Sequence, residues 1–201
     1  EAVIPPPSSD SCLMYLSEET NAINIYDLEP VNNDGLFHDI QNYQLDSAFV
    51  IITHKTLLSS SRSYATYRSS QYDTIVIDIN ELYHQFSSGI YKNPLAIKRF
   101  LLFTMDKWPS WPSHVFLIGK SVRFNNELSP GSRDDSTSYA INLVPSWGYP
   151  SSDNHFAVGL IPGKRGFSLP IGRLSTNNNQ SVLNYLNKVV EIESKQGNNS
   201  A

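Results

Sequence analysis

Phe49-Val50-Ile51-Ile52 is the stretch of sequence that decides the fold. Its apolar residues are consecutive rather than alternating, which is typical of a strand buried on both faces of a parallel sheet. Residues 74–79 and 115–119 repeat this pattern, and residues 169–174 predict a fourth strand. Pro170 lies near the start of that strand, where a missing N–H does least harm. The sequence therefore predicts a sheet that is covered on both sides.

Helical patterns alternate with these strands. Residues 57–69 and 180–193 carry apolar side chains at helical spacing, and Asn93-Pro94 is a favourable start for a helix that ends before Pro109. Residues 83–91 are polar and contain glycine, and we interpret them as a connection. Alternating strands and helices imply right-handed crossovers. We therefore predict an α/β fold with a mostly parallel four-stranded sheet flanked by helices, similar to half of a Rossmann-like domain.

Composition limits both the organisation of the chain and its functions. We expect residues 1–44 to be an irregular lead with one edge strand at 23–28, in the manner of the tail of a preceding β domain. The α/β region then spans 45–196, and residues 197–201 have the composition of a linker. The N-terminus does not resemble a signal peptide, which favours a mature or excised segment. No apolar run is long enough for a membrane span, and a net charge of −4 argues against nucleic-acid binding.

The loop Ser152-Asp153-Asn154-His155 and the strand that contains Arg173 are the first candidate binding site. Asp153, Asn154 and His155 offer oxygen and imidazole groups, so Asp153 could be one ligand of a calcium site. The alternative is that Asp153 caps backbone groups. We expect Arg173 to form an ion pair with a carboxylate such as Asp153.

The ends of the first and third strands provide a second candidate site. His54 follows the first strand and Lys120 follows the third, and in this topology the two ends are neighbours at a switch point, where ligands bind in open α/β sheets. The alternative is that both are solvated loop starts. Gly119-Lys120-Ser121 is not a phosphate-binding loop, because position 114 is His where the motif needs Gly. Asp134-Asp135 is better explained as a mobile acidic turn than as a ligand pair.

Two further features bear on function. The connection between the third and fourth strands, at about residues 120–168, is long enough to be functional, and its aromatic residues could hold a peptide or a glycan. These residues are Tyr139, Trp147, Tyr149 and Phe156. Cys12 is the only cysteine, so the chain has no internal disulfide, and its proline- and serine-rich surroundings favour a structural role over a nucleophilic one. A structural domain of a surface protein remains a third interpretation.

The order of these features resembles the first half of the catalytic domain of the gingipain-like cysteine peptidases, most of all those associated with type IX secretion in Bacteroidetes. The resemblance covers about residues 45–195 and rests on an ordered set of segments. These are residues 48–54, the helix with Tyr64, Tyr67 and Arg68, residues 81–90, 94–101 and 115–120, Ser152-Asp153-Asn154, Ile171-Gly172-Arg173-Leu174 and Val190-Glu191-Ile192-Glu193.

The resemblance implies a caspase-like fold of two subdomains, in which the second carries a catalytic His-Gly turn and the nucleophilic Cys. The five histidines of this chain precede Asp, Lys, Gln, Val and Phe, and no cysteine follows Cys12. No catalytic residue is therefore transferred to this sequence. We expect a supporting subdomain of a secreted or surface-bound peptidase, with the second subdomain as partner and peptides as substrates of the parent. It would require no cofactor, although calcium could bind, and the isolated fragment could form a homodimer through its exposed edge.

Overall fold

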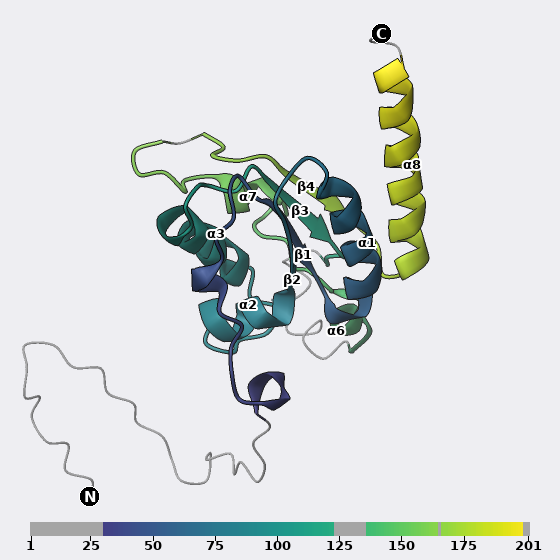
Figure 1. Cartoon of the computed structure of the whole chain (residues 1–201). Coiled ribbons are helices and arrows are strands. Elements are labelled where there is room, and N and C mark those ends of the chain that lie inside the picture. Colours follow the sequence, from purple (N-terminus) through teal and green to yellow (C-terminus); the bar gives the residue numbers. More distant parts are fainter. Residues whose placement is uncertain (1–29, 123–135, 165, 199–201) are drawn as a thin grey trace, which may run out of the picture. The chain divides into compact units, whose positions relative to one another are not determined.

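The computed structural model describes residues 30–122, 136–164 and 166–198 (Figure 1). The chain divides into two compact units, Glu1–Leu36 and Phe37–Ala201. The first unit contains the 3-10 helix η2 (Val31–Asn33), and the second contains every other helix and strand given below. The strand expected at residues 23–28, Cys12 and the Asp134-Asp135 turn lie outside the described residues.

The second unit is built on one parallel sheet of four strands in the order β2-β1-β3-β4. The strands are β1 (Phe49–Thr53), β2 (Thr74–Asp78), β3 (His114–Ile118) and β4 (Ile171–Leu174). Every residue of β1 is buried, as its continuous apolar run predicts. The predicted α/β fold with a parallel four-stranded sheet is confirmed.

Helices cover both faces of this sheet (Figure 1). One face packs against α2 (Ile79–Phe86), α3 (Leu95–Lys107) and the short α7 (Asn154–Ala157), and the other packs against α1 (Leu58–Arg68) and α8 (Asn179–Asn198). The remaining elements are η3 (Ile40–Asn42), η4 (Lys55–Leu57) and α6 (Ser136–Ile141). No helix in the described ranges combines the length and the apolar character that crossing a bilayer requires.

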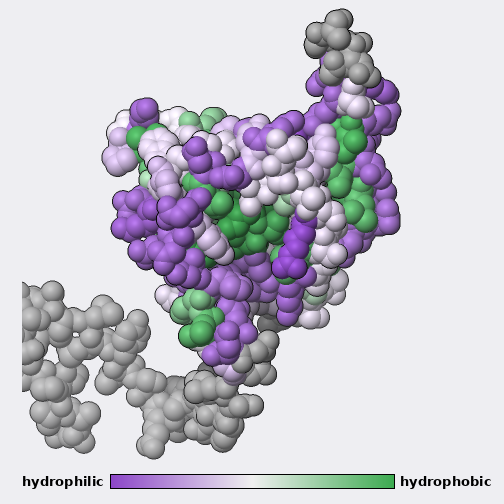
Figure 2. All heavy atoms as spheres, in the orientation of Figure 1, coloured by the Kyte–Doolittle hydropathy of each residue, from purple (hydrophilic) through white to green (hydrophobic). Residues whose placement is uncertain are grey.

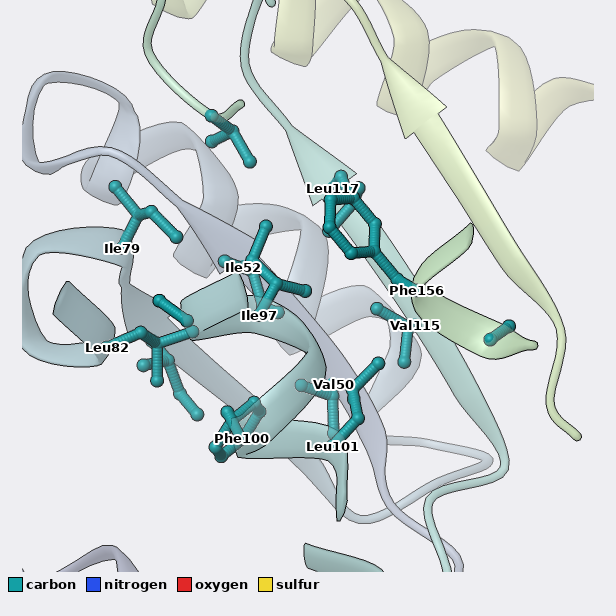
Figure 3. Close-up of a cluster of buried hydrophobic side chains, with 14 of the residues drawn as sticks. Val50, Ile52, Ile79, Leu82, Ile97, Phe100, Leu101, Val115, Leu117 and Phe156 are labelled. Carbon is teal, nitrogen blue, oxygen red and sulfur yellow. The ribbon is translucent and has the colours of Figure 1, made fainter. Parts of the chain in front are cut away.

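Two apolar clusters fill the layers, because alternate residues of each strand point to opposite faces. Val50 and Ile52 of β1 face α3 and α7, where they belong to the same buried cluster as Ile97 and Phe156 (Figure 3). Phe49, Ile51 and Phe116 belong to the cluster on the other face, with Tyr64 of α1 and Val182 of α8.

The helix α2 includes residues 83–86, the first part of the polar connection expected at residues 83–91. Its N-terminus is capped by Asp78, whose side chain accepts a hydrogen bond from the backbone N–H of Asn80 at 3.1 Å. Ile79, Leu82 and Tyr83 are buried at helical spacing. The sequence pattern placed Ile79 in the preceding strand and Tyr83 in the connection. The helical spacing of the three apolar residues was therefore not recognised.

Packing on the sheet begins before residue 45, where the sequence pattern places the start of the α/β region. Residues 38–43, which we call the strap, include the buried Ile40. Trp108 donates its indole N–H to the carbonyl of Ile40 at 3.0 Å, and Tyr43 meets the Trp108 ring edge-on. At the other end of the strap, the backbone N–H of His38 donates to Glu81 at 2.8 Å. The strap is therefore fixed to α2 and to the end of α3.

Candidate functional site

Arg173 and Asp153 form the most tightly connected polar pair at the carboxyl end of the sheet. Arg173 Nε donates to Asp153 Oδ2 at 2.7 Å and Nη2 donates to Oδ1 at 2.7 Å, which is a bidentate ion pair. The Arg173 and Asp153 side chains are only 10% and 21% exposed. The ion pair expected from the sequence is present.

The rest of the Arg173 guanidinium binds backbone carbonyls. Nη1 donates to Gly119 O at 2.8 Å and to Val144 O at 2.7 Å, and Nη2 donates to Pro145 O at 3.0 Å. Every N–H of the guanidinium is thereby used within the protein. Arg173 joins β4 to the end of β3 and to two points of the connection between them. This geometry assigns it a positioning role and leaves none of its donors to a ligand.

The turn after β3 brings the connection close to the sheet. Leu143 and Val144 donate their backbone N–H groups to the carbonyl of Lys120, at 2.9 and 3.1 Å. Gly119 has φ +152, and a Cβ atom there would lie 2.7 Å from Cγ2 of Val144. Glycine is required at this position because the buried Val144 occupies the space that a side chain would need.

In the loop with Asp153, Asn154 and His155, the Asp153 side chain does not make the capping hydrogen bond that one interpretation of the sequence predicts. Asp153 occupies the N-cap position of α7, but its side chain makes no capping hydrogen bond and pairs with Arg173 instead. Asn154 and His155 are exposed. The His155 ring meets Trp147 edge-on, with 6.3 Å between the ring centroids.

His54 and Lys120 follow neighbouring parallel strands, because β1 pairs with β3. His54 Nδ1 accepts a hydrogen bond from the backbone N–H of Thr56 at 3.3 Å and so caps η4. Burial is the main cause of a pKa of His54 below its ordinary value. The Lys120 residue is exposed. Their role as binding residues stays a prediction.

Sequence reasoning missed two lysines that fix the long connection. Lys92 Nζ donates to Asn142 O at 2.5 Å and lies 5.0 Å from the Tyr139 ring centroid. Lys98 Nζ donates to Val158 O at 2.8 Å and lies 5.1 Å from the ring centroid of Trp147. Lys98 lies in the segment 94–101 that contributes to the family resemblance, but nothing in the sequence showed that it or Lys92 binds carbonyls of the distant connection.

The aromatic residues of the connection do not form one surface. Tyr139 and Tyr149 are exposed, Trp147 is half-buried, and Phe156 is fully buried in the core (Figure 3). The expectation that Phe156 could hold a ligand was wrong, because this ring fills the space between α3 and the sheet.

The described residues contain no group of three or more His, Cys, Asp or Glu side chains that could hold a metal ion. Both Asp153 oxygens already accept from Arg173. A calcium ion at Asp153 would have to compete with this guanidinium, so calcium binding stays a prediction that the ion pair does not favour.

Comparison with known proteins gives a family and a fold. The sequence model of peptidase family C25 matches residues 42–201. Among solved structures, the chain is similar to dimeric latent PorU from Porphyromonas gingivalis, with a TM-score of 0.56 and 15% sequence identity. The aligned region covers 74% of this chain and 16% of that chain, so this chain corresponds to a small part of PorU. At this identity the likeness concerns the fold. No curated protein matches the sequence.

Proposed function

This chain belongs to peptidase family C25, the family of the gingipains, and from that membership we propose that it is the non-catalytic first subdomain of a cysteine endopeptidase. In the parent protein, a Cys/His dyad on a second subdomain would hydrolyse peptide bonds. The role of this chain would be to support that dyad.

The position of the cysteine is the observation that carries the proposal. The family match spans residues 42–201, whereas Cys12, the single cysteine, precedes it. None of the five histidines is followed by glycine. The thiolate nucleophile of a cysteine peptidase and its base therefore have to be supplied by another segment.

A supporting subdomain has to hold its loops rigidly at the carboxyl ends of its strands, where α/β proteins build their sites. The Arg173–Asp153 pair meets this requirement, because it ties β4, the end of β3 and the connection together in a largely buried network. The second subdomain would then dock on a surface with fixed geometry.

The proposal includes the partners and location expected from the sequence. The partners would be the second subdomain and, in the parent, a peptide substrate, while nucleic acid would not bind. We further propose a secreted or surface-bound parent processed with the type IX secretion machinery. The PorU chain that shares the fold is described as dimeric and latent, which supports testing this chain for a homodimer. The role requires no cofactor.

A peptidase assay tests the proposal directly. The purified 201-residue chain should not turn over fluorogenic Arg or Lys peptides, and an activity-based thiol probe should not label it. Adding the second subdomain, expressed from the same gene, should produce turnover and labelling of that subdomain alone. Turnover by the isolated chain that disappears in Cys12→Ala would overturn the proposal.

A second candidate function is that of a peptide- or glycan-binding module that uses residues 120–168. The observation in its favour is the exposure of two tyrosines in this connection, with Tyr149 81% exposed. Exposed aromatic rings are suited to stacking on sugars and to peptide side chains. A glycan and peptide array should give a saturable signal that Tyr149→Ala abolishes, and an array without any such signal rules this function out.

A further inference from the structure

In the part of the chain that the structure describes, no strand pairs with the outer edge of the apolar strand β2. The strand order places β2 at one end of the sheet, with β1 as its partner. Ile75 and Val76 are half-buried, and no backbone hydrogen bond joins residues 74–78 to the strap or to any other described segment on the outer side. Edge strands of this kind present backbone N–H and C=O groups that can pair with another extended chain.

The last part of this edge, at Val76, Ile77 and Asp78, lines a recess of about 230 Å³ between two walls. Ile40 and Tyr43 of the strap line one wall, and Leu58 and Arg62 of α1 line the other. Figure 2 shows apolar surface gathered at the centre of this face, between more polar surfaces on either side. The recess therefore combines a strand edge with an apolar pocket, which is the arrangement of binding grooves that accept a peptide as an added strand.

The charges around the recess differ between its interior and its mouth. Glu81 is 3% exposed and accepts hydrogen bonds from the His38 backbone and from Gln85, at 2.8 and 2.6 Å. Asp78 caps α2. Arg62 is exposed and forms no ion pair with any described residue. The acidic groups are thus already engaged, whereas a guanidinium at the mouth is available for a carboxylate.

We propose that this recess binds an extended peptide segment that adds to the edge of β2. The peptide places an apolar side chain between the strap and α1, and one of its carboxylates pairs with Arg62. This binding site is separate from the peptidase role proposed above, because it uses the edge of the sheet farthest from β4 and none of the Arg173 network.

The shape of the recess favours a single extended chain over a second copy of the protein. The strap and α1 both stand beside the edge, and residues from both line the recess. A second sheet approaching edge-on would meet these walls before its own edge strand reached β2. A single extended chain can pair with β2 if the recess leaves room for one strand at the usual spacing of about 4.8 Å between paired strands.

The probe is a fluorescein-labelled, amidated peptide, Glu-Thr-Val-Thr-Val-Thr-Glu, whose terminal glutamates bring a carboxylate to Arg62 in either strand direction. We expect saturable binding by fluorescence anisotropy to the full chain. Arg62→Glu should weaken it about tenfold, which corresponds to about 1.4 kcal/mol. The matched charge reversal Lys164→Glu, on the exposed loop that precedes β4, should change it less than twofold. Proline at both valines of the peptide should abolish binding, because proline cannot donate to a strand.

NMR locates the bound peptide on the protein through changes in backbone amide chemical shifts. We expect the amides of residues 74–78 to shift as peptide is added, and these shifts should saturate at the same peptide concentration as the anisotropy. The proposal is overturned if the peptide fails to saturate at millimolar protein, if Arg62→Glu binds as well as the unchanged chain, or if the shifts fall on β4. It is also overturned if β2 shifts appear without peptide as the protein concentration rises, since that result identifies a second copy as the occupant.

Discussion

Arg173 and Asp153 form a bidentate ion pair, in which Arg173 Nε lies 2.7 Å from Asp153 Oδ2 and Arg173 Nη2 lies 2.7 Å from Asp153 Oδ1. The remaining donors of the same guanidinium hold Gly119, Val144 and Pro145 by their carbonyls. One side chain of β4 therefore ties together the end of β3, the described segment at Val144 and Pro145, and the start of α7. We expect the stability of this side of the domain to depend on this arginine.

We expect Arg173→Ala to destabilise the protein by about 2–4 kcal/mol, because it leaves a largely buried carboxylate and several carbonyls without their partner. For a domain of this size, the melting temperature should fall by roughly 5–15 °C, as measured by circular dichroism. Arg173→Lys should recover little of this loss, because an ammonium cannot reproduce the planar fork. Lys188→Ala, on the exposed side of α8, is the control. An unchanged melting temperature in Arg173→Ala would show that the network is not structurally important.

The packing of Gly119 against Val144 leads to a second prediction. Gly119→Ala should destabilise the protein by about 2–3 kcal/mol, because the new Cβ would overlap the buried Val144 side chain. Gly159→Ala is the control for a positive φ without crowding, since Gly159 has φ +67 and no atom lies within 4 Å of its added Cβ. The free energy of unfolding of this control should fall by only about 1 kcal/mol, the cost of placing alanine in a left-handed backbone conformation. Urea unfolding curves compare the two variants, and equal losses would contradict the packing argument.

His54 should titrate below the ordinary histidine pKa of about 6.5. Burial favours its neutral form, and neutral Nδ1 accepts the N–H of Thr56. Because the pKa is lower in the folded state, the contribution to stability is complete above pH 6.5 and decreases as the pH falls toward the folded pKa. NMR titration of the His54 ring measures this pKa directly. His54→Ala should reduce the dependence of stability on pH in this window, and a ring pKa of 6.5 or higher would refute the prediction.

Glu193 links α8 to α1 and leads to a prediction about acidic pH. A hydrogen bond from Tyr67 at 2.7 Å is the main cause of its lowered pKa, burial opposes this effect, and Arg68 lowers the pKa further. The stabilisation is therefore present above the unfolded pKa of about 4.3 and is lost as the pH falls through the folded pKa. Glu193→Gln should lower the melting temperature at pH 7 and have a smaller effect at pH 3.

The control for this prediction is Glu191→Gln. Glu191 lies on the same helix, but its pair with Lys195 is well exposed, and exposed pairs contribute at most about 1 kcal/mol. A loss at pH 7 that is equal in the two variants, or a Glu193→Gln effect that is unchanged at pH 3, would show that the Tyr67–Glu193–Arg68 contact does not hold α8 in place.

Local patterns were sufficient for the four strands of the sheet but not for every helix. The continuous apolar run at residues 49–52 predicted a buried strand, and both faces of that strand meet helices. The helix α2 was missed because it begins directly at the end of β2, with Asp78 both the last residue of the strand and the cap of the helix. Apolar residues continue from the strand into the helix, so the sequence does not show where one ends and the other begins. Only the backbone geometry locates this boundary.

The candidate site was also predicted only in part from the sequence. The pairing of Arg173 with a carboxylate such as Asp153 followed from residue chemistry alone, but the three carbonyls that use the other guanidinium donors could not be read from the sequence. A carbonyl is present at every residue, so the sequence does not show which ones converge on a side chain. The buried position of Phe156 was unpredictable for a related reason, since α7 has only four residues and shows no periodicity.

By itself, the sequence determined the alternation of strands and helices, the parallel sheet and the resemblance to gingipain-like peptidases. These properties depend on side-chain type and order, which the sequence contains in full. Only the tertiary structure decided that Arg173 holds the loop rather than a ligand, that the strap packs beside the edge of β2, and that this edge forms a recess. These properties depend on which distant groups meet, and long-range contacts are set by the packing of the whole domain.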